Sequence, residues 1–409
     1  MNRIFRLGLG IMTSIGGFVD IGNLVTSGIT GARFGMSLTW AIIVGTIGMT
    51  LYGEMAGRVA AVARRPVFQA IRERLGVRTA MLNLVAFVLL ALLTLAAEIG
   101  GLALILEVVT GLNYLVWVPL IGAAMWLVVW RWPFSLIENL FGLLGLALLV
   151  FVVALFVLPT DWGALGRNAT HPWVPAQDGH PMYFFYAISL FGACLAPYQV
   201  VFFASGGREE HWTTKNLQEM RLNALIGFPL GGLLSIAIMA AAVVVLQPAR
   251  IDVNHLGQVA LPVVQALGPV GLGLALTGFA AAVFAAGTEC TLAIGYSISQ
   301  YFGWQWGKDR PPREAPRFHL ACLGAVLVAT AFILTSIDPI TVTVVSVVLG
   351  AAAVPLTYFP VLVVANDRTY MGRWINRRWT NGIAVVFLVG MMVISIVALP
   401  LIFATKAGR

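Results

Sequence analysis

The first apolar run of the chain carries an acidic residue at its centre, in the stretch Ile15-Gly16-Gly17-Phe18-Val19-Asp20-Ile21-Gly22-Asn23. Glycine, which flanks Asp20 on both sides, and asparagine, which follows at position 23, both have a low helix propensity. Such a stretch therefore predicts an interruption of the helix, which leaves backbone carbonyls without their helical partners in the middle of the run.

A second apolar run is interrupted in a comparable way at Gly192-Ala193-Cys194-Leu195-Ala196-Pro197-Tyr198-Gln199. Proline removes an amide donor and exposes the carbonyl four residues earlier, which belongs to Ala193. An offset of 176 residues, the difference between positions 192 and 16, aligns the two stretches and places Gln199 opposite Asn23. Matched breaks in two halves of a membrane protein predict an inverted-repeat transporter with its site at the midplane.

The composition requires lipid as the solvent. Of the 409 residues, 59% are hydrophobic and 10% are charged, against about 45–50% and 25% in an ordinary soluble domain. The mean hydropathy of +0.91 is too high for a water-soluble core to hide all of the apolar side chains. We expect an all-α polytopic membrane protein.

Eleven apolar runs are long enough to cross a bilayer, which takes about 20 residues. They lie at about 7–27, 37–60, 80–108, 113–130, 137–158, 182–204, 222–246, 266–300, 318–335, 340–364 and 381–403. We expect a single transmembrane domain over 1–409, with repeats at about 7–158 and 182–364 and an extra helix at 381–403. The connectors 159–181 and 247–265 are expected to be ordered surface loops.

Basic residues are unevenly divided between alternate connectors. Twenty of the 25 Lys and Arg fall on one side and five on the other. Since cytoplasmic loops collect basic residues, this bias predicts a cytoplasmic N-terminus and an extracytoplasmic C-terminus in a bacterial-type inner membrane. The net charge of +8 then needs no nucleic acid partner.

Ionisable side chains in apolar runs require a partner or a function, because each costs about 2.5–3.5 kcal/mol in hydrocarbon. Glu54 precedes Arg58 by one helical turn, which predicts an ion pair. Asp20, Glu98 and Glu289 remain at depth. Glu98 could relay protons, hold an exit path or pack against a polar neighbour, and for Glu289 we favour a structural hydrogen bond over a gating role.

The donor atoms at the two breaks are oxygens. They belong to the carboxylate of Asp20, the amides of Asn23 and Gln199, and the exposed carbonyls of Gly17, Ala193 and Ala196. One negative charge among neutral oxygens suits a hard divalent cation such as Mg²⁺, Mn²⁺ or Ca²⁺, and Cys194 is the only soft atom nearby in the sequence. Alternatively, Asp20 makes a structural interhelical hydrogen bond; the flanking glycines and the matched break at Pro197 favour the cation site.

These residues resemble motifs of the Nramp superfamily of divalent-metal transporters, over nearly the whole chain. The stretch 20–23 resembles its first-helix Asp-Pro-Gly-Asn motif, 94–100 is similar to its third-helix Thr-Asp-Leu-Ala-Glu-Phe-Leu-Gly stretch, 196–199 stands where it has Met-Pro-His, and 364–372 resembles its last cytoplasmic loop. The resemblance implies a LeuT-type fold of five plus five helices with helices 1 and 6 broken, and an eleventh helix. It also implies metal uptake into the cytoplasm, with the metal bound by Asp20, Asn23 and the carbonyls of Gly17 and Ala193.

Three positions depart from the family pattern. Ala196 replaces a methionine whose thioether favours transition metals, so the chain resembles the branch of Nramp-related magnesium transporters, whose roomier site accepts a partly hydrated ion. Tyr198 replaces a histidine and Leu95 an acidic residue. Tyrosine, with an unperturbed pKa near 10, is a poor proton carrier, although Asp20 and Glu98 remain candidates for a proton path.

The leading hypothesis is an importer of Mg²⁺ or Mn²⁺ that works by alternating access, with weak or absent proton coupling. It needs no cofactor and no obligatory protein partner besides the bilayer. The alternatives are a proton-coupled Mn²⁺/Fe²⁺ symporter of the ordinary Nramp type and a LeuT-fold carrier of a small organic substrate, for which the buried anion Asp20 is a liability. An enzyme is not expected, because no nucleophile motif or phosphate loop is found in the sequence.

Overall fold

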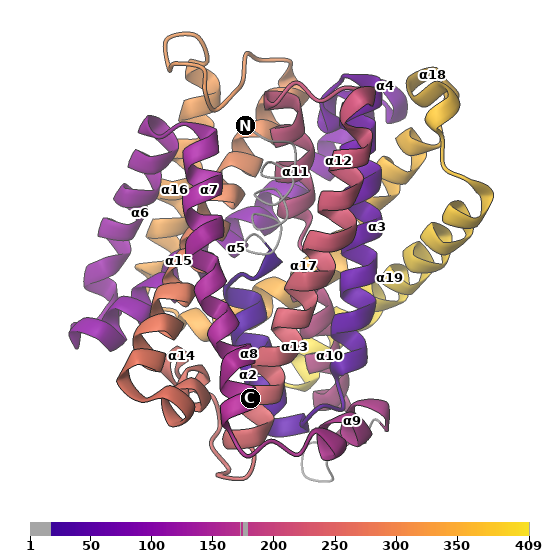
Figure 1. Ribbon diagram of the computed structural model, residues 1–409. Helices are drawn as coiled ribbons and strands as arrows, with labels where there is room; N and C mark the ends of the chain where they lie inside the picture. Colours follow the sequence, from indigo (N-terminus) through magenta and orange to yellow (C-terminus); the bar gives the residue numbers. More distant parts are fainter. Residues whose placement is uncertain (1–17, 172, 175–178, 409) are drawn as a thin grey trace.

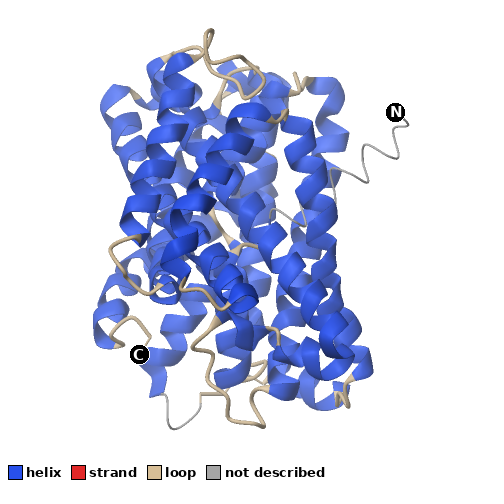
Figure 2. Ribbon diagram, turned by 90° about the vertical axis from the view of Figure 1, so that its left-hand side faces the viewer, coloured by secondary structure: helices blue, strands red, loops and turns tan. Residues whose placement is uncertain are grey.

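The chain folds into a bundle of helices. The computed structural model describes residues 18–171, 173–174 and 179–408, and these residues form helices and no strands (Figures 1 and 2). Nine helical segments in the described ranges are long and apolar enough to cross a membrane. They are Val77–Thr110, Tyr114–Arg131, Asn139–Val157, Gly179–Glu209, Thr214–Val245, Leu261–Phe302, Pro316–Ile333, Pro339–Ala365 and Arg378–Ala404.

These nine segments match the last nine predicted spans, and the other two predicted spans are accounted for separately. The predicted span 37–60 is the 25-residue helix α3 (Thr39–Ala63). The predicted span 7–27 falls largely outside the described residues, and its second part is α2 (Ile21–Phe34). Its predicted end at 27 was wrong by seven residues. The polar side chains there do not end the helix, since the hydroxyls of Thr26 and Thr30 donate to the carbonyls of Gly22 and Thr26 in the preceding turn, at 2.7 and 2.6 Å.

The remaining helices follow in order along the chain. They are α4 (Val67–Leu75), α5 (Val77–Thr110), α6 (Tyr114–Arg131), α7 (Phe134–Gly145), α8 (Val150–Val157), α9 (Trp162–Thr170), α10 (Gly179–Cys194), α11 (Pro197–Glu209), α12 (Leu217–Leu222), α13 (Phe228–Val245), α14 (Leu256–Val259), α15 (Leu261–Phe302), α16 (Pro316–Ile333), α17 (Pro339–Ala365), α18 (Arg368–Met371) and α19 (Arg378–Ala404). The short helical turns η1 (Leu146–Leu149), η2 (Thr214–Asn216), η3 (Asn223–Gly227) and η4 (Gly372–Trp374) join some of them.

The two connectors that we expected to be loops contain the short helices α9 and α14. Asp161 explains the first, because its side chain accepts a hydrogen bond of 2.9 Å from the amide of Ala164 and so caps α9. A further irregularity interrupts α15, where Gly268 has a φ of +63° immediately before Pro269. Pro269 has no amide hydrogen to donate to the helix. Gly268 can adopt the positive φ at this interruption because it has no Cβ atom.

Both predicted helix breaks are present at the centre of the bundle. Asp20 has extended backbone angles and α2 begins only at Ile21. In the second half, α10 ends at Cys194 and α11 begins at Pro197, with Ala196 extended between them. The helix α2 packs against α10, α13 and α17, and α5 packs along α15 and α17. The two breaks therefore face each other, enclosed by α5, α13 and α17.

The connectors rich in arginine lie at one end of the bundle. Figure 1 shows α4 and α18 at the top, and α9, α14 and the C-terminus at the bottom. The helix α19 packs against α17 at the margin of the bundle and leaves large apolar side chains exposed, as at Val386, Ile396 and Phe403. In a bilayer such side chains face lipid.

Candidate cation site at the two helix breaks

Asp20 is fixed by the start of α2. The first amides of a helix have no partner within the helix, and the Oδ1 atom of Asp20 accepts a hydrogen bond of 2.9 Å from the amide of Asn23. The other carboxylate oxygen, Oδ2, accepts a hydrogen bond of 3.2 Å from the hydroxyl of Tyr198. Only 2% of Asp20 is exposed. The carboxylate is thus held between the two broken helices and away from bulk water.

The side-chain amide nitrogen of Asn23 lies among three oxygens. It is 2.9 Å from the carbonyl oxygen of Phe18, 3.0 Å from that of Ala193 and 3.2 Å from Oδ1 of Asp20. An NH₂ group has two hydrogens to share among these three acceptors. Oxygens from both breaks therefore converge on one point, with a single negative charge among them.

The amide oxygen of Asn23 points the other way, toward α13 and the end of α10. It accepts hydrogen bonds from the hydroxyl of Ser235 at 3.1 Å and from the thiol of Cys194 at 3.5 Å. The same Ser235 hydroxyl lies 3.3 Å from the carbonyl of Gly231. Sequence reasoning missed Ser235, although a hydroxyl inside the apolar run of α13 is the kind of residue that bonds across membrane helices.

The residues of the second break take different roles. The side-chain nitrogen of Gln199 donates to the carbonyl of Phe18 at 3.4 Å and to the hydroxyl of Tyr198 at 3.3 Å. The carbonyl of Ala196, which we expected to be exposed by the break, accepts a hydrogen bond of 3.2 Å from the amide of Gln199. Pro197, the first residue of α11, has no amide hydrogen, so the amide of the third residue, Gln199, closes the turn. The carbonyl of Ala196 therefore has a hydrogen-bond donor.

Of the predicted ligands, Gly17 lies outside the described residues. The neighbouring carbonyl of Phe18 faces the site, as its contacts with Asn23 and Gln199 show. The carbonyl of Ala193 lies near the C-terminal end of α10, which carries the negative end of the helix dipole. Such an end is suited to a cation.

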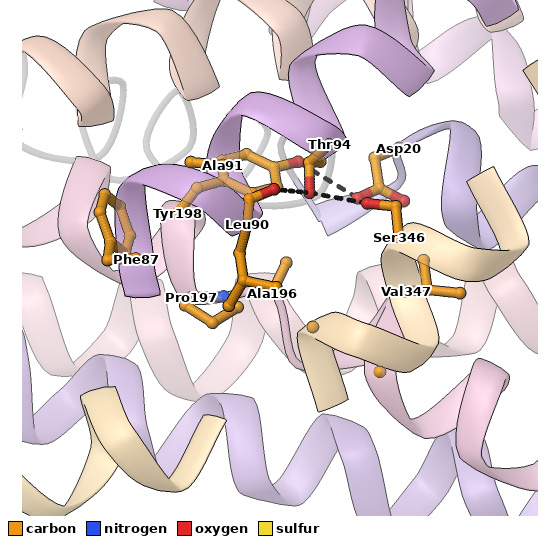
Figure 3. A pocket seen from close by; sticks show the side chains of 12 residues that line it. Asp20, Phe87, Leu90, Ala91, Thr94, Ala196, Pro197, Tyr198, Ser346 and Val347 are labelled. Carbon is orange, nitrogen blue, oxygen red and sulfur yellow. Dashed lines mark hydrogen bonds between the residues drawn. The ribbon is translucent and has the colours of Figure 1, made fainter. Parts of the chain in front are cut away.

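A small cavity adjoins Asp20 (Figure 3). It is lined by residues of α5, by Ala196, Pro197 and Tyr198 from the second break, and by residues of α17. Its volume of about 20 Å³ is enough for one water molecule. Among the lining residues, the hydroxyl of Thr94 in α5 is 3.0 Å from that of Ser346 in α17. The site therefore has room for one water-sized particle beside the carboxylate.

Two further acids flank the site without joining it. The Oε2 atom of Glu98 in α5 accepts a hydrogen bond of 3.4 Å from the amide of Ile21, the first residue of α2. Its Oε1 atom is buried and has no hydrogen-bond partner among the described residues. Glu289 is buried on α15, the helix that packs along α5. Glu98 thus contacts the helix that carries Asp20, whereas no hydrogen bond links Glu289 to Asp20 in the described part of the chain.

The site differs from a conventional metal centre in its donors. Within the described residues, no group of three or more His, Cys, Asp and Glu side chains is arranged to hold a metal ion. The convergent atoms are instead one carboxylate, side-chain amides and backbone carbonyls. Such neutral oxygens are suited to hard cations that keep part of their water shell.

The matched breaks, the buried carboxylate between them and the arrangement of helices define a membrane transporter with the LeuT-type fold. Solved structures share this fold. A manganese transporter of Eremococcus coleocola superimposes with a TM-score of 0.75 at 18% identity, covering 96% of this chain and 85% of that one. The nucleobase-cation-symport-1 family transporter Mhp1, in a closed conformation, gives a TM-score of 0.62 at 16% identity, covering 98% and 92%.

The sequence places the chain more narrowly. The profile of the natural resistance-associated macrophage protein-like (Nramp) family matches residues 10–400, and the chain belongs to this family. Relatives include the divalent metal cation transporters MntH of Chromohalobacter salexigens, 24% identical over 96% of this chain and 90% of the relative, and of Deinococcus radiodurans, 26% identical over 94% and 88%. Family membership agrees with the resemblance found in the motifs.

Proposed function

We propose that this protein imports a divalent cation, Mg²⁺ or Mn²⁺, into the cytoplasm by alternating access of its two broken helices, with weak or absent proton coupling. The observation that carries the proposal is the convergence of Asp20, Asn23 and the carbonyl of Ala193 at the breaks. The names of the relatives support a divalent metal as the cargo.

The proposed ligands are the side chains of Asp20, Asn23 and Gln199 and the carbonyls of Gly17, Ala193 and Ala196. Since a cation requires an oxygen and the nitrogen of Asn23 now faces Asp20, ligation by Asn23 requires its amide to rotate by half a turn. The rotated nitrogen would then face the hydroxyl of Ser235, which can accept a hydrogen bond. The rotation also removes the hydrogen bonds that this nitrogen now donates to the backbone carbonyls of Phe18 and Ala193, which frees both oxygens for the cation.

The residue types at the second break support the proposed choice of cation. A methionine sulfur is a soft ligand that favours transition metals, and Ala196 offers none. The cavity that Ala196 lines has room for one water molecule beside the carboxylate. An ion bound there can therefore keep a water, which suits Mg²⁺ because it dehydrates reluctantly. These properties favour acceptance of Mg²⁺ together with Mn²⁺. A cavity of about 20 Å³ is small for an organic substrate.

The proposal of weak proton coupling is supported by Tyr198. Tyr198 stands where the family motif has a histidine, and its hydroxyl contacts Asp20 directly. A phenol with an ordinary pKa near 10 exchanges few protons at neutral pH. Uptake would then be driven by the concentration gradient and by the membrane potential, which supplies about 2.3 kcal/mol per charge per 100 mV.

A proton-coupled symporter of Mn²⁺ or Fe²⁺ is the second candidate function. It is favoured by one observation, the contact of Glu98 with the first amide of α2, because this places a second buried acid beside the helix that carries Asp20. In that mechanism a proton taken up near Asp20 would leave along α5 by way of Glu98. Internal pH measured during uptake separates the two candidates.

Uptake of Mg²⁺ and Mn²⁺ into proteoliposomes tests the proposal. We expect Asp20→Asn, which keeps the shape and removes the charge, to lower uptake by at least about tenfold, since a lost charged ligand costs more than 1.4 kcal/mol. Glu107→Gln makes the same chemical change near a helix end, where Glu107 accepts a hydrogen bond from the amide of Tyr114, and should retain uptake. An Asp20→Asn protein that folds and transports like the parent would refute the site.

A further inference from the structure

A large cavity opens on the flank of the bundle, away from the cation site. It lies between α3, the segment from α12 to α13, and the start of α19, and it measures about 930 Å³. Ligand-binding pockets in proteins measure about 300–1,000 Å³, so this cavity has the size of a binding site. Nothing in the proposed transport mechanism uses it.

One part of the cavity wall is apolar and exposed. Its side chains include Ile43, Ile47 and Leu51 from α3 and Leu225 and Leu233 from the opposite side. Ile43, Ile47, Leu225 and Leu233 are 48%, 50%, 55% and 59% exposed. On a membrane-spanning bundle these side chains line a space that hydrocarbon fills.

The other part of the wall is strongly basic. Arg58, Arg221, Arg373 and Arg377 line it, and Glu54 is the one acid among the lining residues. Four positive charges against one negative charge leave an excess of three. Glu54 and Arg58 lie in the half of α3 that leads to α4, and Arg373 and Arg377 lie between α18 and the body of α19. Figure 1 shows α4 and α18 at the same end of the bundle, which we predict to be cytoplasmic.

Ion pairing holds this basic wall in place. Glu54 accepts from Arg58 at 3.0 Å, which confirms the predicted pair, and from Arg221 at 2.9 Å. Arg58 also donates to the carbonyl of Trp374 at 2.5 Å and to the side chain of Asn376, and so ties the start of α19 to α3. The side chain of Arg58 is 4% exposed, whereas that of Arg221 is 41% exposed and keeps donors available to another acceptor.

Arg373 and Arg377 carry charges that no described acidic side chain neutralises. Both are exposed, and neither forms an ion pair with a described residue. The guanidinium of Arg373 lies 5.1 Å from the centre of the ring of Trp374. Trp379, 64% exposed, also lines the cavity. Tryptophan is enriched at the boundary between membrane and water, which places this wall at the level of the lipid headgroups.

The part of the cavity between Ile43 and Glu54, the first charged residue of its wall on α3, is as long as one leaflet. Ile43 and Glu54 are eleven residues apart on α3, which corresponds to about 16 Å at 1.5 Å per residue. The hydrocarbon core of a bilayer is about 30 Å thick, so a single leaflet is about 15 Å. An acyl chain that starts at the basic wall would therefore reach Ile43 near the centre of the bilayer.

We propose that this cavity binds an anionic phospholipid of the leaflet at the basic end of the bundle. Its phosphate would lie against Arg221, Arg373 and Arg377, and an acyl chain would lie along Ile43 and Ile47. A soluble anion would leave the apolar wall unfilled, and an acidic peptide would have to enter hydrocarbon. The excess positive charge and the apolar wall together select a lipid, and the assignment does not depend on which ion the protein carries.

Lipid binding to the purified full-length protein tests this assignment by native mass spectrometry and by thermal unfolding. The probes are phosphatidylglycerol and phosphatidylcholine with the same acyl chains. We expect preferential retention of phosphatidylglycerol and a higher unfolding temperature in its presence. Replacing both Arg373 and Arg377 by alanine should lower the affinity for phosphatidylglycerol about 25-fold, at about fivefold for each arginine near the surface.

A matched control lies at the start of α16, where Arg317 is the second residue of the helix and Arg313 precedes it. Arg317 lies over the ring of Trp304 at 5.2 Å, and Arg313 is exposed, but neither lines the cavity. Replacing this pair by alanine removes the same charge from the same end and should change the affinity less than twofold. Equal losses from the two double variants, or equal retention of the two lipids by the parent, would overturn the proposal.

The apolar wall supplies a second test that leaves every arginine in place. Ile47→Trp fills the wall beside the acyl chain, so it should lower retention of phosphatidylglycerol at least fivefold. Glycerol phosphate, which carries the headgroup charge without acyl chains, should fail to compete. Full competition by glycerol phosphate together with normal retention by Ile47→Trp would show a site for small anions and would overturn the lipid assignment.

Discussion

Ala196 is the residue at which the choice between ions can be tested directly. It lines the small cavity beside Asp20, and its side chain is 7% exposed. Ala196→Met places a soft sulfur in that cavity and displaces the water that accompanies a hydrated ion. We expect the ratio of Mn²⁺ to Mg²⁺ uptake in proteoliposomes to rise about tenfold.

Ala196→Leu is the matched control for this change, because leucine adds similar bulk without sulfur. It should slow the uptake of both ions and leave their ratio close to that of the parent. If Met and Leu shift the ratio equally, volume rather than sulfur sets the selectivity. An unchanged ratio in the Met variant would remove Ala196 as the determinant.

Tyr198 is the residue at which proton coupling can be introduced. Its hydroxyl contacts the carboxylate of Asp20 at 3.2 Å. Tyr198→His replaces a phenol with a group whose unperturbed pKa is near 6.5, so we expect internal acidification to follow metal uptake more strongly than in the parent. A pH dye inside the vesicles measures this directly.

Tyr198→Phe separates the loss of the hydroxyl from the gain of a titrating group. It should transport without added acidification, since phenylalanine carries no exchangeable proton. Strong acidification that accompanies metal entry in the parent protein would contradict the uncoupled mechanism and favour the symporter with Glu98 on its proton path.

Which residues gather at the site could be anticipated only in part. The sequence predicted that Asp20, Asn23 and Ala193 belong to one site, because breaks reveal themselves through glycine, proline and polar residues within apolar runs. It did not predict the carbonyl of Phe18 or the hydroxyl of Ser235. The direction of a carbonyl depends on local backbone angles, and the approach of α13 depends on packing, so neither is visible as a residue pattern.

At the level of elements, the close approach of α10 and α17 depends on Gly192. A Cβ atom at this position would overlap the carbonyl oxygen of Val347 and lie 3.0 Å from the Cβ of Ala351. We expect Gly192→Ala to lower the free energy of unfolding by about 1–3 kcal/mol through overpacking. The change should appear as a lower thermal-unfolding midpoint and slower uptake.

Gly324 on α16 supplies the comparison, since a Cβ atom there has no neighbour within 4 Å. Gly324→Ala should stabilise the protein slightly, because alanine is the better helix former by about 1 kcal/mol. If Gly192→Ala were as harmless as Gly324→Ala, the contact between α10 and α17 would not be tight in the membrane.

Helix existence was predictable from hydropathy, and helix ends were less so. The predicted spans after the first agree with helices to within a few residues, because about 20 apolar residues are a strong signal. The first span was predicted to end at 27, whereas α2 continues for seven more residues to Phe34. Threonines that bond to the preceding helical turn lower the hydropathy as loop residues do, although they do not end the helix. The short helix α9 depends on the capping of a single residue, Asp161.

For the whole molecule, orientation in the membrane is the testable property. The basic connectors gather at one end of the bundle, and α9 lies at the other. Arg310→Cys and Arg167→Cys place reactive thiols at the two ends, while the native Cys194, Cys290 and Cys322 are buried. A membrane-impermeant maleimide should label the Arg167→Cys variant in intact bacterial cells and the Arg310→Cys variant only after permeabilisation.

The reverse labelling pattern would contradict the predicted cytoplasmic N-terminus. The sequence supports this prediction because the positive-inside rule counts residues and needs no coordinates. By contrast, the cavity on the flank of the bundle was not predictable. Its existence depends on how the start of α19 is held against α3 by Arg58 and on the space left between them, and hydropathy describes each helix separately.

The hydroxyl of Ser235 links Asn23 at the site to α13, a helix that supplies none of the proposed ligands. At present its single proton is shared between the oxygen of Asn23 and the carbonyl of Gly231. If Asn23 turned its oxygen toward a cation as proposed, the hydroxyl of Ser235 would accept a hydrogen bond from the nitrogen of Asn23. It would then donate only to the carbonyl of Gly231. In the proposed mechanism, the hydrogen bond between α2 and α13 would therefore reverse its direction when a cation binds, before any helix has to move.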